Sequence, residues 1–190
     1  MMERVILASQ SPRRRELLSR IFAEFEVMPS LAEEVAETNA PAEYVKTLAK
    51  AKAEEVASRV GGDALVIGSD TVVALDGKIL EKPKDADDAF RMLSALSGRA
   101  HEVYTGVALS IGGKTLVEHE VTRVWFRDLA EDEISRYIAS GEPMDKAGAY
   151  GIQEKGAQLV RKIEGDYFNV VGLPVCRLCE MLHSLGYTTL

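Results

Sequence analysis

A group of polar and basic residues near the start of the chain has the types and spacing needed to bind a polyanion. Residues 5–8 are apolar and predict a short buried strand. Ser11 then predicts a helix N-cap, with Pro12 at the first helical position. Residues 13–15 are all arginine, the wrong sign for a helix N-terminus. Hydroxyl, amide and guanidinium groups that converge there would bind a polyanion, and the alternative is a solvated basic first turn.

A carboxylate in the middle of a β-prone run is the second candidate. Residues 64–75 read ALVIGSDTVVAL and predict a strand, with Asp70 near its centre. Burying a carboxylate there costs free energy unless it is paired, hydrogen-bonded or bound to a metal. Asp70 is therefore the strongest candidate for a functional carboxylate. The alternative is a structural role in which it caps local N–H groups.

Two lysines occupy positions from which an ammonium group could reach a site. A helix is predicted from about residue 40 to Arg59, stopped by Gly61-Gly62, and Lys52 lies on its apolar stripe. The Lys52 side chain either extends past this stripe to solvent or points into a cleft. Lys82 follows a short strand predicted from residue 78, at a strand end where sites commonly lie. The stripe comprises Val45, Leu48, Ala49, Ala53 and Val56.

Acidic residues and glycines mark two further segments. Residues 30–40 include Glu33, Glu34 and Glu37 and predict a loop, whose carboxylates taken alone indicate a solvated charge run. Residues 141–174 form a second unusual stretch, in which glycines permit tight turns and a close approach to a ligand. Such a loop inside a regular domain usually has a function.

A short cysteine motif near the end of the chain suggests a metal or redox site. Cys176, Cys179 and His183 can share one face of a helix predicted to start after Pro174. A closed zinc site needs a fourth ligand, and the sequence has no second cluster of Cys and His. The pattern therefore favours ordinary helix packing.

Composition excludes several classes of protein. The chain has 190 residues, of which 46% are hydrophobic and 28% charged, as in a globular domain with a real core. Its net charge of −7 argues against binding a nucleic acid polymer or a membrane surface, so positive charge for an anionic substrate must be local. No stretch approaches 18 apolar residues, and no basic segment followed by an apolar run opens the chain. We therefore expect a cytoplasmic protein.

The remaining elements follow from hydrophobic periodicity and turn residues. Asp76-Gly77 predicts a hairpin turn. The other predicted helices cover residues 12–22, 85–98 and 131–140 and a last one from Pro174, and the other predicted strands cover residues 25–28, 100–111, 114–127, 157–163 and 167–171.

Six segments together resemble one known family, the Maf family of nucleoside triphosphate pyrophosphatases. The two most specific are residues 9–14, which read SQSPRR, and residues 145–153, which read DKAGAYGIQ. The other segments, in the family's order, are GSDT at 68–71, EKP at 81–83, LSGR at 96–99 and VGLP at 171–174. One departure is Glu154, where many relatives carry glycine.

The resemblance implies a fold and an activity. The fold would be a single Maf-like domain over residues 1–190, an elongated α/β structure of the Maf and ITPase type. It would have a mixed, largely antiparallel sheet flanked by helices, with two lobes and a central cleft, often as a homodimer. The enzyme would hydrolyse a nucleoside triphosphate to the monophosphate and pyrophosphate, cleansing the nucleotide pool, with a divalent cation, Mg or Mn. The alternative is a non-catalytic nucleotide-binding regulator of septum formation and cell division.

The resemblance also assigns roles to individual residues. Asp70 takes the place of the family's proton acceptor, and with Glu34 it would bind the cation. Lys52 and Lys82 would serve catalysis at the triphosphate. Ser9, Arg13, Thr71 and Gln153 would bind the substrate and set specificity.

The complete DKAGAYGIQ segment resembles the subgroup that acts on dTTP and UTP. A glutamine amide offers a donor and an acceptor, so Gln153 could pair with the N3–H and carbonyl edge of uracil or thymine.

Overall fold

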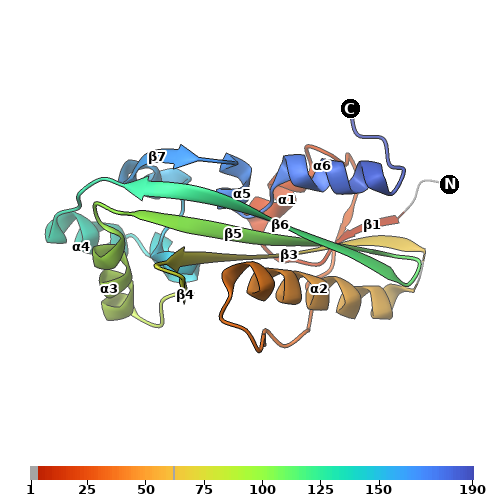
Figure 1. Ribbon diagram of the computed structural model, residues 1–190, viewed down its shortest axis with the longest axis horizontal. Coiled ribbons are helices and arrows are strands. Elements are labelled where there is room, and N and C mark those ends of the chain that lie inside the picture. Colours follow the sequence, from red (N-terminus) through yellow and green to blue (C-terminus); the bar gives the residue numbers. More distant parts are fainter. Residues whose placement is uncertain (1–3, 62) are drawn as a thin grey trace.

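The computed structural model describes residues 4–61 and 63–190, and Gly62, predicted to help stop a helix, lies outside these described residues. Strands, helices and short 3-10 helices alternate along this part of the chain (Figure 1). No helix among them is long and apolar enough to cross a bilayer. The strands are β1 (Arg4–Leu7), β2 (Glu26–Val27), β3 (Ala64–Leu75), β4 (Lys78–Leu80), β5 (Ala100–Ile111), β6 (Lys114–Phe126) and β7 (Val160–Glu164). The helices are α1 (Pro12–Leu18), α2 (Pro41–Val60), α3 (Ala86–Leu96), α4 (Glu131–Ala139), α5 (Tyr167–Val171) and α6 (Val175–Ser184), with 3-10 helices η1 (Glu142–Asp145), η2 (Ala147–Ala149) and η3 (Glu154–Leu159).

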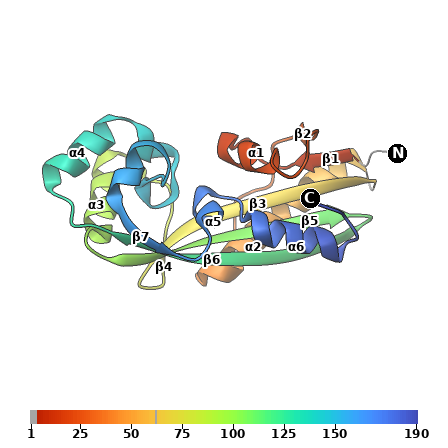
Figure 2. The ribbon, with the colours of Figure 1, turned by 90° about the horizontal axis from the view of Figure 1, so that it is seen from above.

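One mixed sheet organises the fold, in the strand order β2-β1-β3-β5-β6-β7, with β4 also paired to β3. β1 runs parallel to β2 and β3, and the other pairs are antiparallel. The long strands β3, β5 and β6 extend through the whole molecule, so it is elongated along them (Figures 1 and 2). This arrangement confirms the predicted α/β class with a largely antiparallel sheet.

The edge of β3 opposite β5 is paired at its two ends and open between them. β1 follows β3 as far as the pair Leu7 and Ile67, and the last residue of β4, Leu80, lies opposite Val73. Within the described chain, no strand pairs with this edge between those two points. Residues 68–72 are therefore held by β5 on one side and free on the other, and Asp70 lies in this open part.

Helix α2 packs tightly against one face of the sheet because two strands carry glycine beneath it. A Cβ atom at Gly68 would lie 2.8 Å from the amide nitrogen of Ala53 and closer still to the carbonyl oxygen of Ala49. A Cβ at Gly106 on β5 would overlap the backbone of Val45. The predicted apolar stripe of α2 is buried in this contact, as expected from its helical spacing.

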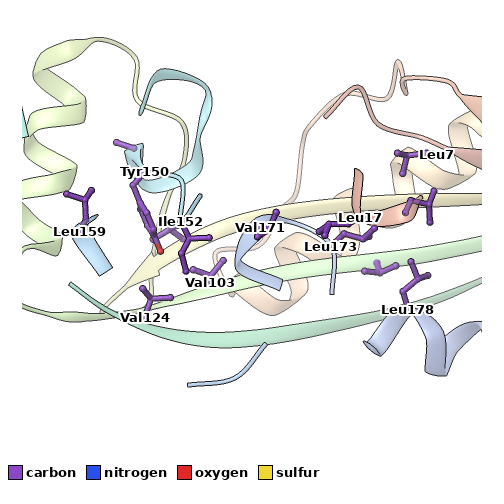
Figure 3. Packing of buried hydrophobic residues seen from close by; sticks show 14 of the residues in the cluster. Leu7, Leu17, Val103, Val124, Tyr150, Ile152, Leu159, Val171, Leu173 and Leu178 are labelled. Carbon is purple, nitrogen blue, oxygen red and sulfur yellow. The ribbon is translucent and has the colours of Figure 1, made fainter. Parts of the chain in front are cut away.

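The main hydrophobic core lies on the other face of the sheet. It joins α1, α5 and α6 to β3 and β5 and continues toward α3, α4 and the 3-10 helices (Figures 1 and 3). Leu17 of α1, Leu178 of α6 and Leu173 before it are at most 2% exposed. Each fully buried leucine of this kind contributes about 1.5–3 kcal/mol to folding.

Four of the predicted elements differ from the structure, one in type and three in their bounds. Residues 167–171 were expected as a strand and form α5, because Asp166 accepts a hydrogen bond from the amide of Phe168 (2.8 Å) and starts a helix there. The strand expected over residues 157–163 begins only at Val160, after the 3-10 helix η3. The first helix ends at Leu18 rather than near residue 22, and β2 is limited to two residues.

Candidate active site

A cleft of about 720 Å³ lies at the open part of the β3 edge. Its walls come from segments far apart in the sequence. All eight residues to which the family resemblance assigns a role line this cleft: Ser9, Arg13, Glu34, Lys52, Asp70, Thr71, Lys82 and Gln153. The predicted loop over residues 30–40 contributes only Glu34 of its three named glutamates.

An ammonium group bridges two carboxylates at the centre of the cleft. The Nζ atom of Lys52 lies 2.6 Å from Oδ1 of Asp70 and 2.7 Å from Oε1 of Glu34. The Lys52 and Asp70 side chains are 12% and 11% exposed, whereas that of Glu34 is 63% exposed. Lys52 therefore points into the cleft rather than past the helix to solvent. Its hydrogen bond lowers the pKa of Glu34, and the charges of Lys82 and Arg14 act in the same direction.

The second oxygen of Asp70 faces no donor. Oδ2 has no hydrogen-bond partner among the residues that the structure describes, although Asp70 is only 8% exposed. A carboxylate that is oriented through one oxygen and open at the other can accept a proton from a ligand or a water molecule.

A tyrosine and a third carboxylate stand beside Lys82 at one end of the cleft. The hydroxyl of Tyr44 on α2 donates to Oε1 of Glu81 (2.8 Å), and both residues line the cleft together with Lys82. Burial and this hydrogen bond raise the pKa of Tyr44 to about 12, so it acts as a donor at neutral pH. Neither Tyr44 nor Glu81 was singled out from the sequence.

Arg14, rather than Arg13, is the arginine built into the wall of the cleft. Its Nε donates to the carbonyl oxygen of Gly172 (2.8 Å), Nη2 to Oγ1 of Thr71 (3.0 Å) and Nη1 to Oγ of Ser9 (3.4 Å). Burial lowers the pKa of its guanidinium from the ordinary value, and the charge of Asp70 opposes this effect. Arg14 thus ties the segment after β1 to β3 and to the end of α5.

The hydrogen bonds around Thr71 have a determined direction. Oγ1 of Thr105 donates to the carbonyl oxygen of Asn169 (2.9 Å), so it can only accept from Thr71, 2.9 Å away. The Thr71 hydroxyl therefore donates to Thr105 and accepts from Arg14. This chain fixes the rotamer of Thr71 and commits its single proton to the protein.

Arg13 reaches the cleft from the neighbouring position on α1. Its Nη1 lies 3.7 Å from a carboxylate oxygen of Asp145. Among the described residues, this single, long contact leaves most of the N–H donors of the Arg13 guanidinium unused. Arg15 does not contribute to this cleft: it is exposed on another side of the helix. Of the three arginines, Arg13 and Arg14 therefore converge on the cleft and Arg15 does not, because successive residues of a helix point about 100° apart.

The glycine-rich segment closes the cleft opposite α1. Gly148 adopts φ +68°, and a Cβ there would lie 2.8 Å from the side chain of Val73, so the segment packs directly on β3. Its amide also donates to the carbonyl oxygen of Glu81 (3.1 Å). Gln153 is half-buried and precedes η3. The next residue, Glu154, has φ +53°, a left-handed conformation that favours glycine, the residue that the family resemblance leads one to expect there.

The acidic residues of the cleft suit a divalent cation that arrives with a ligand. No group of three or more His, Cys, Asp or Glu side chains able to hold a metal ion occurs in the described part of the chain. The carboxylates of Asp70 and Glu34 both contact the ammonium nitrogen of Lys52. Their oxygens are therefore close enough to be shared by one positively charged group. Mg²⁺ commonly binds through one or two carboxylates together with substrate phosphates. These two residues therefore fit such an ion.

The cysteine motif lies away from the cleft. Cys176 is exposed and Cys179 half-buried on α6, and Nε2 of His183 lies 2.7 Å from the hydroxyl of Thr189. None of these residues lines the cleft.

Comparison with known proteins places the chain among relatives of similar length. The Maf-like protein family model matches residues 4–185. A protein of Alkaliphilus metalliredigens named dTTP/UTP pyrophosphatase is 52% identical over 186 residues, which cover 96% of each chain. Proteins with the same name from Carboxydothermus hydrogenoformans and Thermococcus kodakarensis are 53% and 52% identical; the matches cover 97% and 98% of this chain and 100% and 98% of theirs.

A solved structure shares the fold at low sequence identity. The HAM1 protein from Coxiella burnetii superposes with a TM-score of 0.51 at 17% identity, over 96% of this chain and all of that one. Together with the family match over nearly the whole length, the sheet, the cleft and the motifs that line it show that this chain belongs to the Maf family.

Proposed function

We propose that this protein hydrolyses dTTP and UTP to the nucleoside monophosphate and pyrophosphate. The observation that carries the proposal is the arrangement of Asp70, Lys52 and Glu34 in a cleft that is also lined by basic residues and by the Gln153 segment. Relatives at 50–53% identity that are named dTTP/UTP pyrophosphatase support the choice of reaction.

Asp70 acts as the proton acceptor in this proposal. Its free oxygen, Oδ2, takes a proton from water as the water oxygen attacks the α-phosphorus. The bond from that phosphorus to the α,β-bridging oxygen breaks, and its electron pair leaves with pyrophosphate. Lys52, fixed 2.6 Å from Oδ1, holds the carboxylate in one orientation and adds positive charge beside the reacting phosphate.

The triphosphate carries about four negative charges, which the cleft must neutralise in a protein of net charge −7. Lys52, Lys82 and Arg13 are the cations with donors that can turn toward it. Arg14 holds Ser9 and Thr71 in place instead, because three of its donors are committed to the protein. Phosphoryl transfer depends mainly on this kind of positioning and charge neutralisation.

A divalent cation, Mg or Mn, completes the proposed site, held by Asp70 and Glu34. When bound, it would neutralise phosphate charge and make an adjacent water more acidic. Glu34 is ionised at neutral pH, since its pKa is lowered, and its 63% exposed side chain can turn from Lys52 toward an incoming ion.

Pyrophosphate release from dTTP, UTP, CTP, GTP and 7-methyl-GTP, with magnesium or manganese, tests the reaction. The wild type should prefer dTTP and UTP, and Asp70→Asn should lower kcat by about 10²–10⁴-fold while the fold is kept. Near-wild-type turnover by a folded Asp70→Asn would contradict the role of Asp70. Binding without pyrophosphate release would instead support a non-catalytic nucleotide-binding regulator.

Base selectivity is assigned to Gln153, whose amide can pair with the N3–H and carbonyl edge of uracil or thymine. Gln153→Ala should reduce the preference for dTTP over CTP, because a site built around hydrogen bonds rejects a mismatched base by leaving polar groups unpaired. Unchanged selectivity in this variant would show that another group recognises the base.

The homodimer belongs to this proposal as a prediction from the family resemblance, and the cytoplasmic location as a prediction from the sequence pattern. Sedimentation of the purified protein at several concentrations tests the dimer, and fractionation of cells that make it tests the location.

A further inference from the structure

A single carboxylate holds the segment that presents Gln153. Glu142, the first residue of η1, is half-buried and lies outside the cleft lining. Its Oε1 accepts hydrogen bonds from the hydroxyl of Tyr137 (2.9 Å) and the amide of Gly156 (3.0 Å), and its Oε2 accepts from the amide of Lys155 (3.1 Å). Two of the three groups that donate to Glu142 are therefore backbone amides, and both follow Gln153 and Glu154 closely in the sequence.

Tyr137 fixes the backbone on the other side of Gln153, before it in the sequence. Its hydroxyl, donating to Glu142, accepts from the amide of Gly151 (3.2 Å). Burial raises the pKa of this tyrosine, which is 6% exposed, so the hydroxyl keeps its proton and stays a donor. We call Glu142 and Tyr137 together the clasp. It fixes backbone amides two residues before Gln153 and two and three residues after it.

The clasped segment is closed upon itself. A Cβ atom at Gly156 would overlap the carbonyl oxygen of Gly151 and lie 2.7 Å from the Tyr137 hydroxyl, so the two ends of residues 151–156 touch. Lys146 packs against Gly151, and its ammonium donates to the carbonyl oxygen of Glu142 (2.7 Å). The segment thus forms a small loop with Gln153 near its tip.

The side chain of Gln153 depends on this backbone for its orientation. Among the described residues, it has no hydrogen-bond partner of its own. An amide that is free to turn over could pair with cytosine as well as with uracil or thymine, because turning exchanges donor and acceptor. The amide can still rotate about its last torsion, so discrimination between these bases depends on where the fixed backbone places it relative to the groups that a bound base would meet.

We propose that Glu142 is a positioning residue for base discrimination: it holds the Gln153 loop through Lys155, Gly156 and Tyr137, and so sets the preference for dTTP and UTP over CTP. This inference rests on the proposed function for its substrates. The clasp itself is independent of that function, because it consists of contacts within the protein.

The test compares Glu142→Ala with the wild type in two measurements. Amide hydrogen exchange, read by NMR without nucleotide, should show lost protection at Lys155 and Gly156. The ratio of kcat/KM for dTTP to that for CTP should fall by about tenfold or more, since three hydrogen bonds to a charged group are lost. Asp132→Ala, which removes an exposed carboxylate on α4 that forms an ion pair with Arg136, is the matched control and should change neither.

Two milder variants keep the test decisive if Glu142→Ala does not fold. Glu142→Gln retains one acceptor oxygen but turns an NH₂ group toward a backbone donor, so its selectivity should lie between those of wild type and Glu142→Ala. Tyr137→Phe removes only the hydroxyl that holds Gly151, and should lower the same ratio.

The two proposals fail in different ways. A wild type that hydrolyses neither dTTP nor UTP contradicts the proposed function. Unchanged protection at Lys155 and Gly156 in a folded Glu142→Ala contradicts the clasp, whatever the activity. Lost protection with an unchanged dTTP-to-CTP ratio contradicts the positioning role of Glu142.

Discussion

Acidification from pH 6.5 to 4 should remove about 3 kcal/mol of folding stability through one buried histidine. His101 on β5 is 2% exposed and packs edge-on against the rings of Phe126 and Tyr150. Its Nε2 lies 2.7 Å from the Tyr150 hydroxyl, and its Nδ1 is buried with no partner among the described residues. An imidazolium there would carry a charge with nothing to balance it, so burial lowers the pKa of His101 from 6.5 to about 4.

The direction and size of the effect follow from proton linkage. The unfolded chain takes up the proton near pH 6.5, whereas the folded protein takes it up only near pH 4. Stability is therefore complete above pH 6.5 and declines as the pH falls toward 4, below which His101 adds no further loss. Each pKa unit corresponds to about 1.4 kcal/mol, so this shift is worth roughly 3 kcal/mol.

The assay is urea unfolding of the wild type and His101→Gln at several pH values between 7 and 4. The difference in unfolding free energy between them should change by roughly 3 kcal/mol across this range, in the direction that favours the variant at low pH. His119→Gln, on β6 outside the aromatic cluster, controls for the loss of a histidine. NMR titration gives the pKa directly, and a midpoint for folded His101 near 6.5 would refute the reasoning.

Three substitutions test packing and charge elsewhere. Lys52→Met leaves the carboxylate of Asp70 buried without its ammonium, so urea unfolding should show a loss of roughly 3–5 kcal/mol, and unchanged stability would mean that Asp70 finds another partner. Glu154→Gly relieves a backbone held at φ +53° and should raise stability by up to about 1 kcal/mol, whereas a fall in Tm would contradict this account. Gly68→Ala pushes a methyl group into Ala49 and should cost about 1–3 kcal/mol; a variant as stable as wild type would show that α2 can move away.

The parts of the fold that local signals determine could be predicted from the sequence. β3 covers the expected residues 64–75 because its run of β-branched residues ends at a turn dipeptide. That dipeptide, Asp76-Gly77, has φ +51° and +75°, as the tight hairpin turn that it predicts requires. The stripe of α2 is buried as predicted, because helical spacing alone places those five residues on one face.

Other features depend on contacts that no local pattern encodes. Residues 167–171 are rich in β-prone types, yet they form α5, where Asn169 donates to the carbonyl oxygen of Val103 and to Thr122 across the core. Five residues are too few for periodicity to separate a helix from a strand. The different orientations of Arg13 and Arg15 could have been predicted, since a helix turns successive side chains in different directions.

The membership of the cleft follows from topology rather than from any one segment. Tyr44 and Glu81 meet there because the start of α2 lies beside the end of β4; nothing in the local sequence marks Tyr44, and Glu81 belongs to the EKP segment but was given no role. Arg14 was recognisable as part of a basic cluster, but its hydrogen bonds to Thr71 and Gly172 require the strand and the end of α5 to lie side by side. The roles assigned to the eight cleft residues remain predictions for the assays above.

The open edge of β3 leaves Asp70 reachable from the cleft although its strand is firmly held. Asp70 belongs to a strand paired with β5 over nine residues, and Gly68 locks that strand against α2, so the carboxylate is a fixed point in the molecule. The walls of the cleft include residues 29–34 and 145–154, which are connections outside the strand ladder; the second of these is held instead by the packing of Gly148 on β3 and by the clasp. A ligand that enters the cleft therefore meets a carboxylate of fixed position, between walls whose backbone is not part of the sheet.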